Sequence, residues 1–134
     1  MSRGGRGTGH ALGYLFLEHE TVKTSELTEA ALDWAVCRAQ HPDADMSATH
    51  VWLDTGDGED DFLIDKTSTD WAQGGPIIER EKIGINPASL PCSDWVADTQ
   101  IIRERTHQYG PTPLIAAMRC YVASKLGDEV EVPF

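Results

Sequence analysis

The chain has 134 residues, of which 40% are hydrophobic, and this suits one globular domain with a single core. No run of about eighteen apolar residues occurs, so no membrane-spanning helix is predicted. The formal net charge is −11, which argues against nonspecific binding to nucleic acid but permits a basic protein partner. The three cysteines are widely spaced without a C-x-x-C motif, which favours reduced thiols over a disulfide frame or a zinc site.

Residues 1–21 differ from the rest of the chain because they begin basic and glycine-rich. A short apolar run over 11–17 is followed by Glu18, His19 and Glu20 rather than by small residues, so we do not expect a cleaved signal peptide. The sequence therefore predicts an atypical, flexible N-terminal extension over 1–21 and a single domain over 22–134.

Two long buried helices are predicted. The first runs over about 29–40, with Thr28 as its N-cap, and ends before Pro42. The second runs over about 113–126, because Thr112 suits the N-cap, Pro113 the first helical position and Gly127 the stop.

The second helix is apolar almost all round, as a core helix is. One of its faces carries small residues that allow another backbone to approach closely, either a helix or sheet of the same chain or a second subunit. This face consists of Ala116, Cys120, Ala123, Ser124 and Gly127.

Short strands complete the fold. Residues 49–53 and 62–65 are expected to form a hairpin through an acidic loop over 54–61, whose spacing does not fit a calcium loop. Further strands are predicted at 83–85, 95–97 and 129–132, with a loop over 86–92 and a loop or mobile helix over 100–109. The predicted class is α+β, with the two long helices packed on a short-stranded antiparallel sheet.

The stretch Trp71 to Ile78 is the best candidate for a ligand site. Pro76 suits the first turn of a short helix over about 76–82, and Gly74 and Gly75 ahead of it would leave N–H groups open to an anion. Trp71 offers a flat face for stacking. The alternative is that this glycine-rich stretch is a tight structural corner.

Arg119 is the one charge in the middle of the second long helix. It either pairs with a carboxylate such as Asp128 or Glu129, or points into the same ligand pocket, where its guanidinium fork suits phosphate or carboxylate. The candidate ligand-binding residues are Trp71, Gly74, Gly75 and Arg119.

No catalytic or metal site is predicted. The G-x-S-x-G, H-E-x-x-H and Walker motifs are absent from the sequence, and the five histidines are scattered. His50 and Trp52 would point to the same face of a strand, which is more often structural than catalytic. We therefore expect no catalytic residue, metal or cofactor. A binding protein is favoured over an enzyme.

Three blocks of the sequence resemble the NinX-like proteins of tailed phages and prophages. They are VKTSELT with ALDWAV over 22–36, STDW with GGPII over 68–78, and GPTPLIAAMR over 110–119. The resemblance covers about 22–134 and implies a phage or prophage origin and action in the bacterial cytoplasm. Family members begin near Val22, and valine can be encoded by the alternative start codon GTG, so residues 1–21 are expected to be translated upstream sequence or an added extension. The family is a domain of unknown function, so no catalytic residue can be transferred from it.

These observations predict a non-enzymatic binding protein that acts on a host protein or sequesters a small anionic nucleotide, such as a defence signal. The alternatives are a small enzyme acting on a nucleotide or cofactor, and an acidic DNA mimic. A homo-oligomer is compatible with the small-residue face.

Overall fold

The computed structural model describes residues 20–54, 58–90, 93–99 and 106–134. Most of the predicted N-terminal extension, residues 1–19, lies outside the described part, whereas Glu20 and Thr21 already belong to the first strand. The elements in chain order are β1 (Glu20–Lys23), η1 (Thr24–Glu26), α2 (Glu29–Gln40), β2 (Asp45–Met46), β3 (His50–Asp54), β4 (Glu59–Leu63), α3 (Trp71–Glu81), β5 (Ile83–Leu90), β6 (Ser93–Thr99), β7 (His107–Gly110), α4 (Pro113–Leu126) and β8 (Glu129–Val132).

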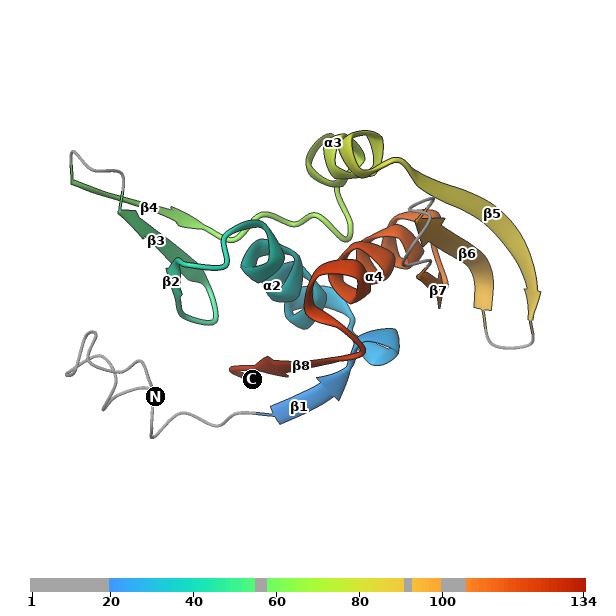
Figure 1. Cartoon of the computed structure of the whole chain (residues 1–134), viewed down its shortest axis with the longest axis horizontal. Helices are drawn as coiled ribbons and strands as arrows, with labels where there is room; N and C mark the ends of the chain where they lie inside the picture. Colours follow the sequence, from blue (N-terminus) through green and yellow to red (C-terminus); the bar gives the residue numbers. More distant parts are fainter. Residues whose placement is uncertain (1–19, 55–57, 91–92, 100–105) are drawn as a thin grey trace.

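The fold is α+β, as predicted, but within the described residues its strands form three small antiparallel sheets instead of one. Their strand orders are β1-β8, β2-β3-β4 and β5-β6-β7. The helices α2 and α4 pack against each other in the middle of the molecule. In Figure 1 the β2–β4 sheet lies at one end, the β5–β7 sheet at the other, and α3 and the β1–β8 pair lie on opposite sides of the helices.

Both long helices have the predicted bounds, and in α4 the end signals act as expected. Thr112 accepts a hydrogen bond from the Ile115 N–H at 3.1 Å, and Pro113 is the first helical residue of α4. Gly127 ends α4 with φ of 92°, a conformation that favours glycine. Thr28 has the extended backbone of an N-cap at the start of α2, and its carbonyl accepts the Leu32 N–H at 3.2 Å, but its hydroxyl makes no capping hydrogen bond.

The core is centred on these two helices. The helical patterns predict a core of Leu32, Trp34 or Ala35, Val36, Ile77, Leu114, Ile115, Met118, Tyr121 and Val122. All of these are buried, Trp34 and Ala35 both included, except for Ile115, which is only partly buried. The confirmed set is Leu32, Trp34, Ala35, Val36, Ile77, Leu114, Met118, Tyr121 and Val122.

The small-residue face of α4 packs within the same chain. A side chain at Gly110 of β7 would come within 2.7 Å of the Ala116 backbone nitrogen, and the Cys120 thiol donates to the Thr106 carbonyl at 3.2 Å. The predicted close approach of backbones is therefore met by the β5–β7 sheet around Ala116 and Cys120.

The chain ends come together as the β1–β8 pair. Val130 and Val132 of β8 are buried whereas Glu129 and Glu131 are exposed, which confirms the predicted alternation. The Thr24 hydroxyl donates to the Gly127 carbonyl at 2.6 Å, and the Thr24 N–H donates to the Asp128 carbonyl at 2.7 Å. Buried Thr24 thus holds the turn that follows α4.

Three loop predictions are wrong in the described residues. The β5 strand continues to Leu90, so the predicted loop over 86–92 is a strand as far as the description reaches. Pro87 is tolerated because β5 is an edge strand, where a missing N–H need not break a pairing on both sides.

The predicted loop or helix over 100–109 is a strand at its end, because residues 107–110 form β7, while 100–105 lie outside the described part. The predicted hairpin is confirmed as β3–β4, but β4 begins at Glu59, so the acidic loop is shorter than expected.

Candidate functional site

The α3 helix begins at Trp71, not at Pro76 as predicted. Asp70 takes the N-cap position, and its carboxylate accepts the Ala72 N–H at 2.9 Å. A carboxylate at this position satisfies a first-turn N–H and favours the positive end of the helix dipole. Pro76 consequently lies inside α3, where it leaves one helical hydrogen bond unmade.

This shift removes the predicted anion site. The Gly74 N–H donates to the Asp70 carbonyl at 2.8 Å, and Gly75 lies one residue further into the helix, where the N–H points back along the chain. The N–H groups that the sequence assigned to an anion are therefore used inside α3.

The two glycines have different structural roles. Gly74 is buried, and a Cβ there would clash with the Thr67 carbonyl and come within 2.7 Å of Leu114 Cδ1 on α4. At Gly75, apart from the adjacent residues and the backbone of the helix itself, the nearest atom to such a Cβ is Trp71 Cε3, at 3.9 Å. Gly74 therefore allows α3 to pack closely on the preceding loop and α4, whereas Gly75 leaves space beside the Trp71 ring.

Arg119 is buried, with 8% of its surface exposed, and both of its observed bonds go to backbone carbonyls. Its Nε donates to Leu27 at 2.9 Å and its Nη1 to Tyr109 at 2.7 Å. Burial lowers the pKa of the Arg119 guanidinium. The predicted pairing with Asp128 or Glu129 is wrong, because this side chain instead ties α4 to β7 and to the end of η1.

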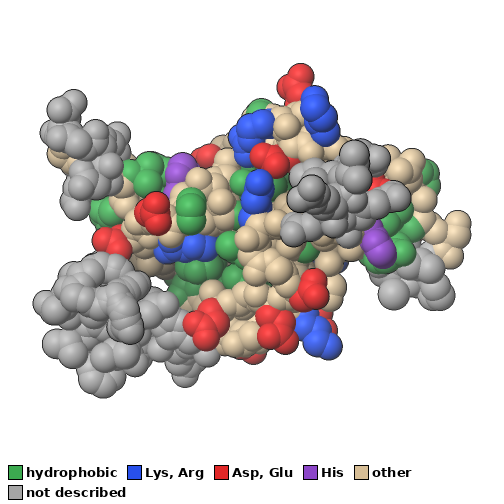
Figure 2. Space-filling model, in the orientation of Figure 1, with side chains coloured by type: hydrophobic (Ala, Val, Ile, Leu, Met, Phe, Trp, Pro, Cys, Tyr) green, Lys and Arg blue, Asp and Glu red, His purple; other side chains and the backbone are tan. Residues whose placement is uncertain are grey.

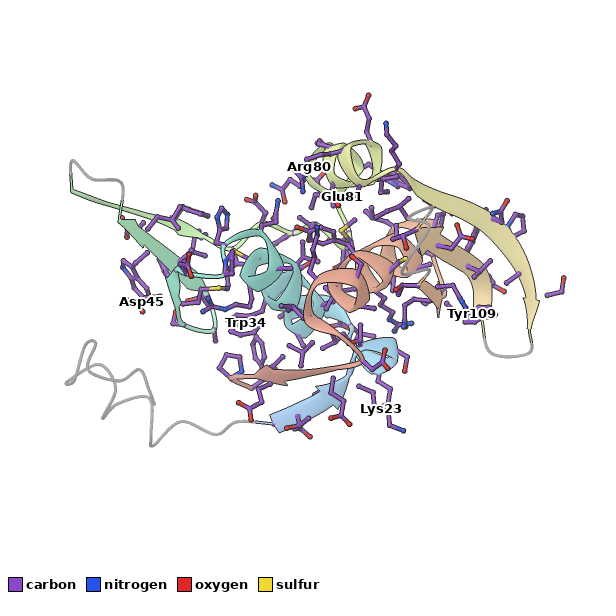
Figure 3. All side chains as sticks on the ribbon, in the orientation of Figure 1. Lys23, Trp34, Asp45, Arg80, Glu81 and Tyr109 are labelled. Atoms are coloured by element: carbon purple, nitrogen blue, oxygen red, sulfur yellow. The ribbon has the colours of Figure 1, made fainter. Side chains whose placement is uncertain are left out.

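The four predicted residues consequently do not form one pocket. Leu114 is the α4 residue next to Gly74, and Arg119 lies roughly 140° further round the helix. It points toward Tyr109 of β7, which Figure 3 labels well apart from Arg80 and Glu81 of α3. Of the two candidate residues that have side chains, Arg119 is buried, whereas Trp71 is exposed over 54% of its surface.

Trp71 lies at the outer surface of α3. Pro76 on the same helix is also exposed, and Gly75 is half-buried at the edge of the Trp71 ring. Charged side chains of both signs surround this part of the molecule in Figure 2. The arrangement is an apolar anchor with a polar border on a short helix, rather than a cavity.

A family model described as bacteriophage P22 NinX matches residues 23–125. The chain belongs to this NinX family. The match spans α2 and α3 and nearly all of α4, so the helical centre and Trp71 both lie within the family region. A search of curated proteins returned no match.

Other candidate sites in the NinX chain carry less chemistry. In the part of the chain that the structure describes, no group of three His, Cys, Asp or Glu side chains is placed to hold a metal ion, and no helix is long and apolar enough to cross a bilayer. A shallow hollow of about 270 Å³ lies against the β1–β8 turn and is lined by Lys23, Ser25, Gln108, Asp128 and Glu129. Its open, mixed-charge lining offers no convergent set of groups for one ligand.

The titratable groups inside the core are structural. Burial raises the pKa of the Cys37 thiol to about 11 and that of the Cys120 thiol to about 12, so both are protonated at neutral pH and poorly nucleophilic. The Asp33 carboxylate accepts the Ser68 N–H at 2.8 Å, and burial also raises its pKa. This bond fixes the segment leading into α3 against α2.

The β2–β3–β4 sheet carries a feature that sequence reasoning missed in part. The His50 and Trp52 rings stack with centroids 5.8 Å apart and an interplanar angle of 22°, on the face that their spacing in the strand predicted. The neighbouring strands place Asp45 and Asp61 opposite Trp52. These two acids lie beside the aromatic pair because of the pairing register of the three strands. That register could not be predicted from the sequence.

Proposed function

We propose that this NinX-family protein is a phage-encoded accessory protein that acts by binding a host protein, and that it has no catalytic role of its own. The proposal rests on Trp71, a large aromatic side chain that is 54% exposed at the capped start of α3. Family membership supports a phage accessory role.

Trp71 has the properties of an interface anchor. Tryptophan buries about 150–250 Å² and is enriched among the residues that dominate binding energy. A position at the start of a helix held by the Asp70 cap limits the backbone freedom that is lost on binding. The exposed Pro76 and the space beside Gly75 would allow a partner surface to reach the ring.

A small anionic nucleotide is a weaker candidate ligand. It needs several donors converging on phosphate, and the two predicted sources are used elsewhere: the Gly74 N–H within α3, and the Arg119 guanidinium in the core. Stacking on Trp71 would remain, but without a nearby set of donors it gives little selectivity for a nucleotide.

Site-specific photocrosslinking tests this proposal. A photoreactive phenylalanine analogue would replace Trp71 in one sample and Phe134 in the other, in protein expressed in the bacterial host. Phe134 is the matched control because it is also an exposed aromatic, at 41%. We expect a discrete protein adduct from position 71 that is absent from position 134, and affinity capture of the same host protein by wild type but at least tenfold less by Trp71→Ala.

Three results would contradict the proposal. Trp71→Ala could capture the same host protein as well as wild type does. Native mass spectrometry could instead find a nucleotide that is released unchanged on denaturation, which would restore the small-ligand hypothesis. Turnover of a nucleotide or cofactor by the purified protein would establish an enzyme.

A further inference from the structure

The β2–β3–β4 sheet has two unlike faces. One face packs on the core, where Val51 is fully buried and its β2 partner Met46 is also buried. On the same face the Phe62 and His41 rings lie at an interplanar angle of 73°, with their centroids 5.8 Å apart. Because side chains alternate along a strand, His50 and Trp52 point to the other face. This outward face, which we call the acidic aromatic face, consists of Asp45, His50, Trp52, Asp61 and Leu63.

The strand register arranges this face in two rows. Asp45, Trp52 and Asp61 are partners across the three strands, so one aromatic residue stands between two acids. In the next row His50 stands opposite Leu63. The stacked His50 and Trp52 rings join the two rows.

The β4 side of this face is exposed to solvent, and the face lies apart from the proposed Trp71 contact. Leu63 is 64% exposed, the most exposed large hydrophobic side chain among the described residues, and Asp61 is also exposed. Figure 3 labels Asp45 at the end of the molecule formed by β2, β3 and β4. In Figure 1 this end projects away from α3.

The combination of groups selects the sign of the ligand's charge. An arginine side chain can stack its guanidinium on a tryptophan or histidine ring, direct its N–H groups to carboxylates and rest its aliphatic stem on an apolar side chain. All three features occur on this face. A phosphate or a nucleotide would instead meet two carboxylates in a chain whose net charge is −11.

We propose that the acidic aromatic face is a docking surface for a basic segment of a partner protein, with an arginine lying against Trp52 and His50 between Asp45 and Asp61. Charge complementarity favours this occupant over a second copy of the same acidic chain. The inference is independent of the Trp71 contact, because a different sheet and different residues carry it.

A defined peptide tests the docking surface without knowledge of the partner. The ¹⁵N-labelled full chain would be titrated with an acetylated Gly-Ser peptide that contains three arginines. Otherwise identical peptides with three lysines or three citrullines would serve as comparisons. We expect chemical-shift changes centred on β2, β3, β4 and the Trp52 indole, with arginine binding about two- to fivefold tighter than lysine. Citrulline should cause no saturable shift, and higher salt should weaken the arginine complex.

Matched variants separate this site from general attraction to an acidic protein. Asp61→Asn should weaken arginine-peptide binding several-fold, whereas Glu131→Gln, which removes an equal charge from the exposed face of β8, should not. Trp52→Leu should abolish the preference for arginine over lysine, while Trp71→Ala should leave peptide binding unchanged.

Several outcomes would overturn the inference. They are equal losses in Asp61→Asn and Glu131→Gln, shifts spread over all acidic surfaces, equal binding of arginine and lysine peptides, or no shift at millimolar peptide. If Trp52→Leu fails to fold, Asp61→Asn and the wild-type peptide comparison still decide the question. An intact docking surface with no effect of Trp71→Ala on host capture would disprove the proposed function alone.

Discussion

The α4 helix and the β2–β3–β4 sheet use their polar residues in opposite ways. In α4 the one mid-helix charge, Arg119, is buried and bound to two carbonyls of its own chain. In the sheet, Asp61 is exposed and Asp45 half-exposed beside a stacked aromatic pair. An unusual residue in the centre of this fold therefore indicates internal structure, while at the sheet end an acidic side chain and a large apolar side chain, Asp61 and Leu63, are exposed to solvent.

The largest change in stability is expected from Met118→Ala, in the centre of α4. Met118 is fully buried, so its truncation removes apolar contacts and leaves a cavity, at an expected cost of about 2–5 kcal/mol in the free energy of unfolding. Urea denaturation followed by circular dichroism measures this cost. A change below about 0.5 kcal/mol would mean that Met118 does not pack in the core.

The next effect is expected from Arg119→Lys. The variant retains the charge, but an ammonium on a flexible stem cannot reproduce the fork that reaches both Leu27 and Tyr109. Leaving one buried carbonyl without a donor costs about 1–3 kcal/mol. Chemical denaturation should show this loss, with hydrogen exchange increasing first in β7 and around Leu27. Unchanged stability with loss of ligand binding would instead restore the predicted role in a pocket.

The origin of these two expectations also shows what the sequence could predict. The bounds of α2 and α4 followed from local signals, since Thr112, Pro113 and Gly127 act within one turn of the helix. The role of Arg119 did not, because its partners lie 92 and 10 residues away along the chain. The surroundings of Trp52 likewise depend on a register that joins three strands.

The misplaced start of α3 has a different cause. Helix propensity favoured a break at Gly74-Gly75-Pro76, since glycine and proline both disfavour a helix interior. Tertiary packing overrides that preference, because only a residue without a side chain fits between the Thr67 carbonyl and Leu114. The structure therefore does not bring the four candidate residues together: Arg119 is buried in the core, and Trp71 is exposed on α3.

The paired glycines allow this explanation to be tested. Gly74→Ala should destabilise the protein by about 1–3 kcal/mol, because its Cβ meets backbone that cannot move freely. Gly75→Ala should have a smaller effect, because outside its own chain neighbours its Cβ meets only the Trp71 ring, at 3.9 Å. The preference of alanine for a helix interior is there opposed by the restriction that the following Pro76 places on a helical residue with a Cβ. Thermal unfolding of both variants measures the difference. Equal effects at the two positions would show that packing at Gly74 does not explain the glycine pair.

The core thiols provide a smaller, pH-dependent test. In a Cys92→Ser background, Cys37 and Cys120 should react slowly with a thiol reagent at pH 8 and rapidly after denaturation, because burial raises the pKa values of these thiols to about 11 and 12. The unfolded thiols have lower pKa values, near 9. Their contribution to stability is therefore fully present below about pH 9 and is lost as the pH rises through the folded values. Fast reaction of native protein would show that the core opens frequently.

The smallest effects on stability are expected at the proposed contact surfaces. Trp71→Ala and Asp61→Asn should each change the free energy of unfolding by less than about 0.5 kcal/mol, because both side chains are largely in water and surface substitutions away from a cap or core contact are usually mild. Replacing Trp71 leaves the helix cap intact, because the capping carboxylate belongs to Asp70. Thermal and urea unfolding measured beside Met118→Ala would place both variants on the same scale. A large loss of stability in either variant would mean that the residue supports the fold. If Asp61→Asn showed it, the sheet end of the molecule would resemble the helical centre, because its polar groups would also be used internally.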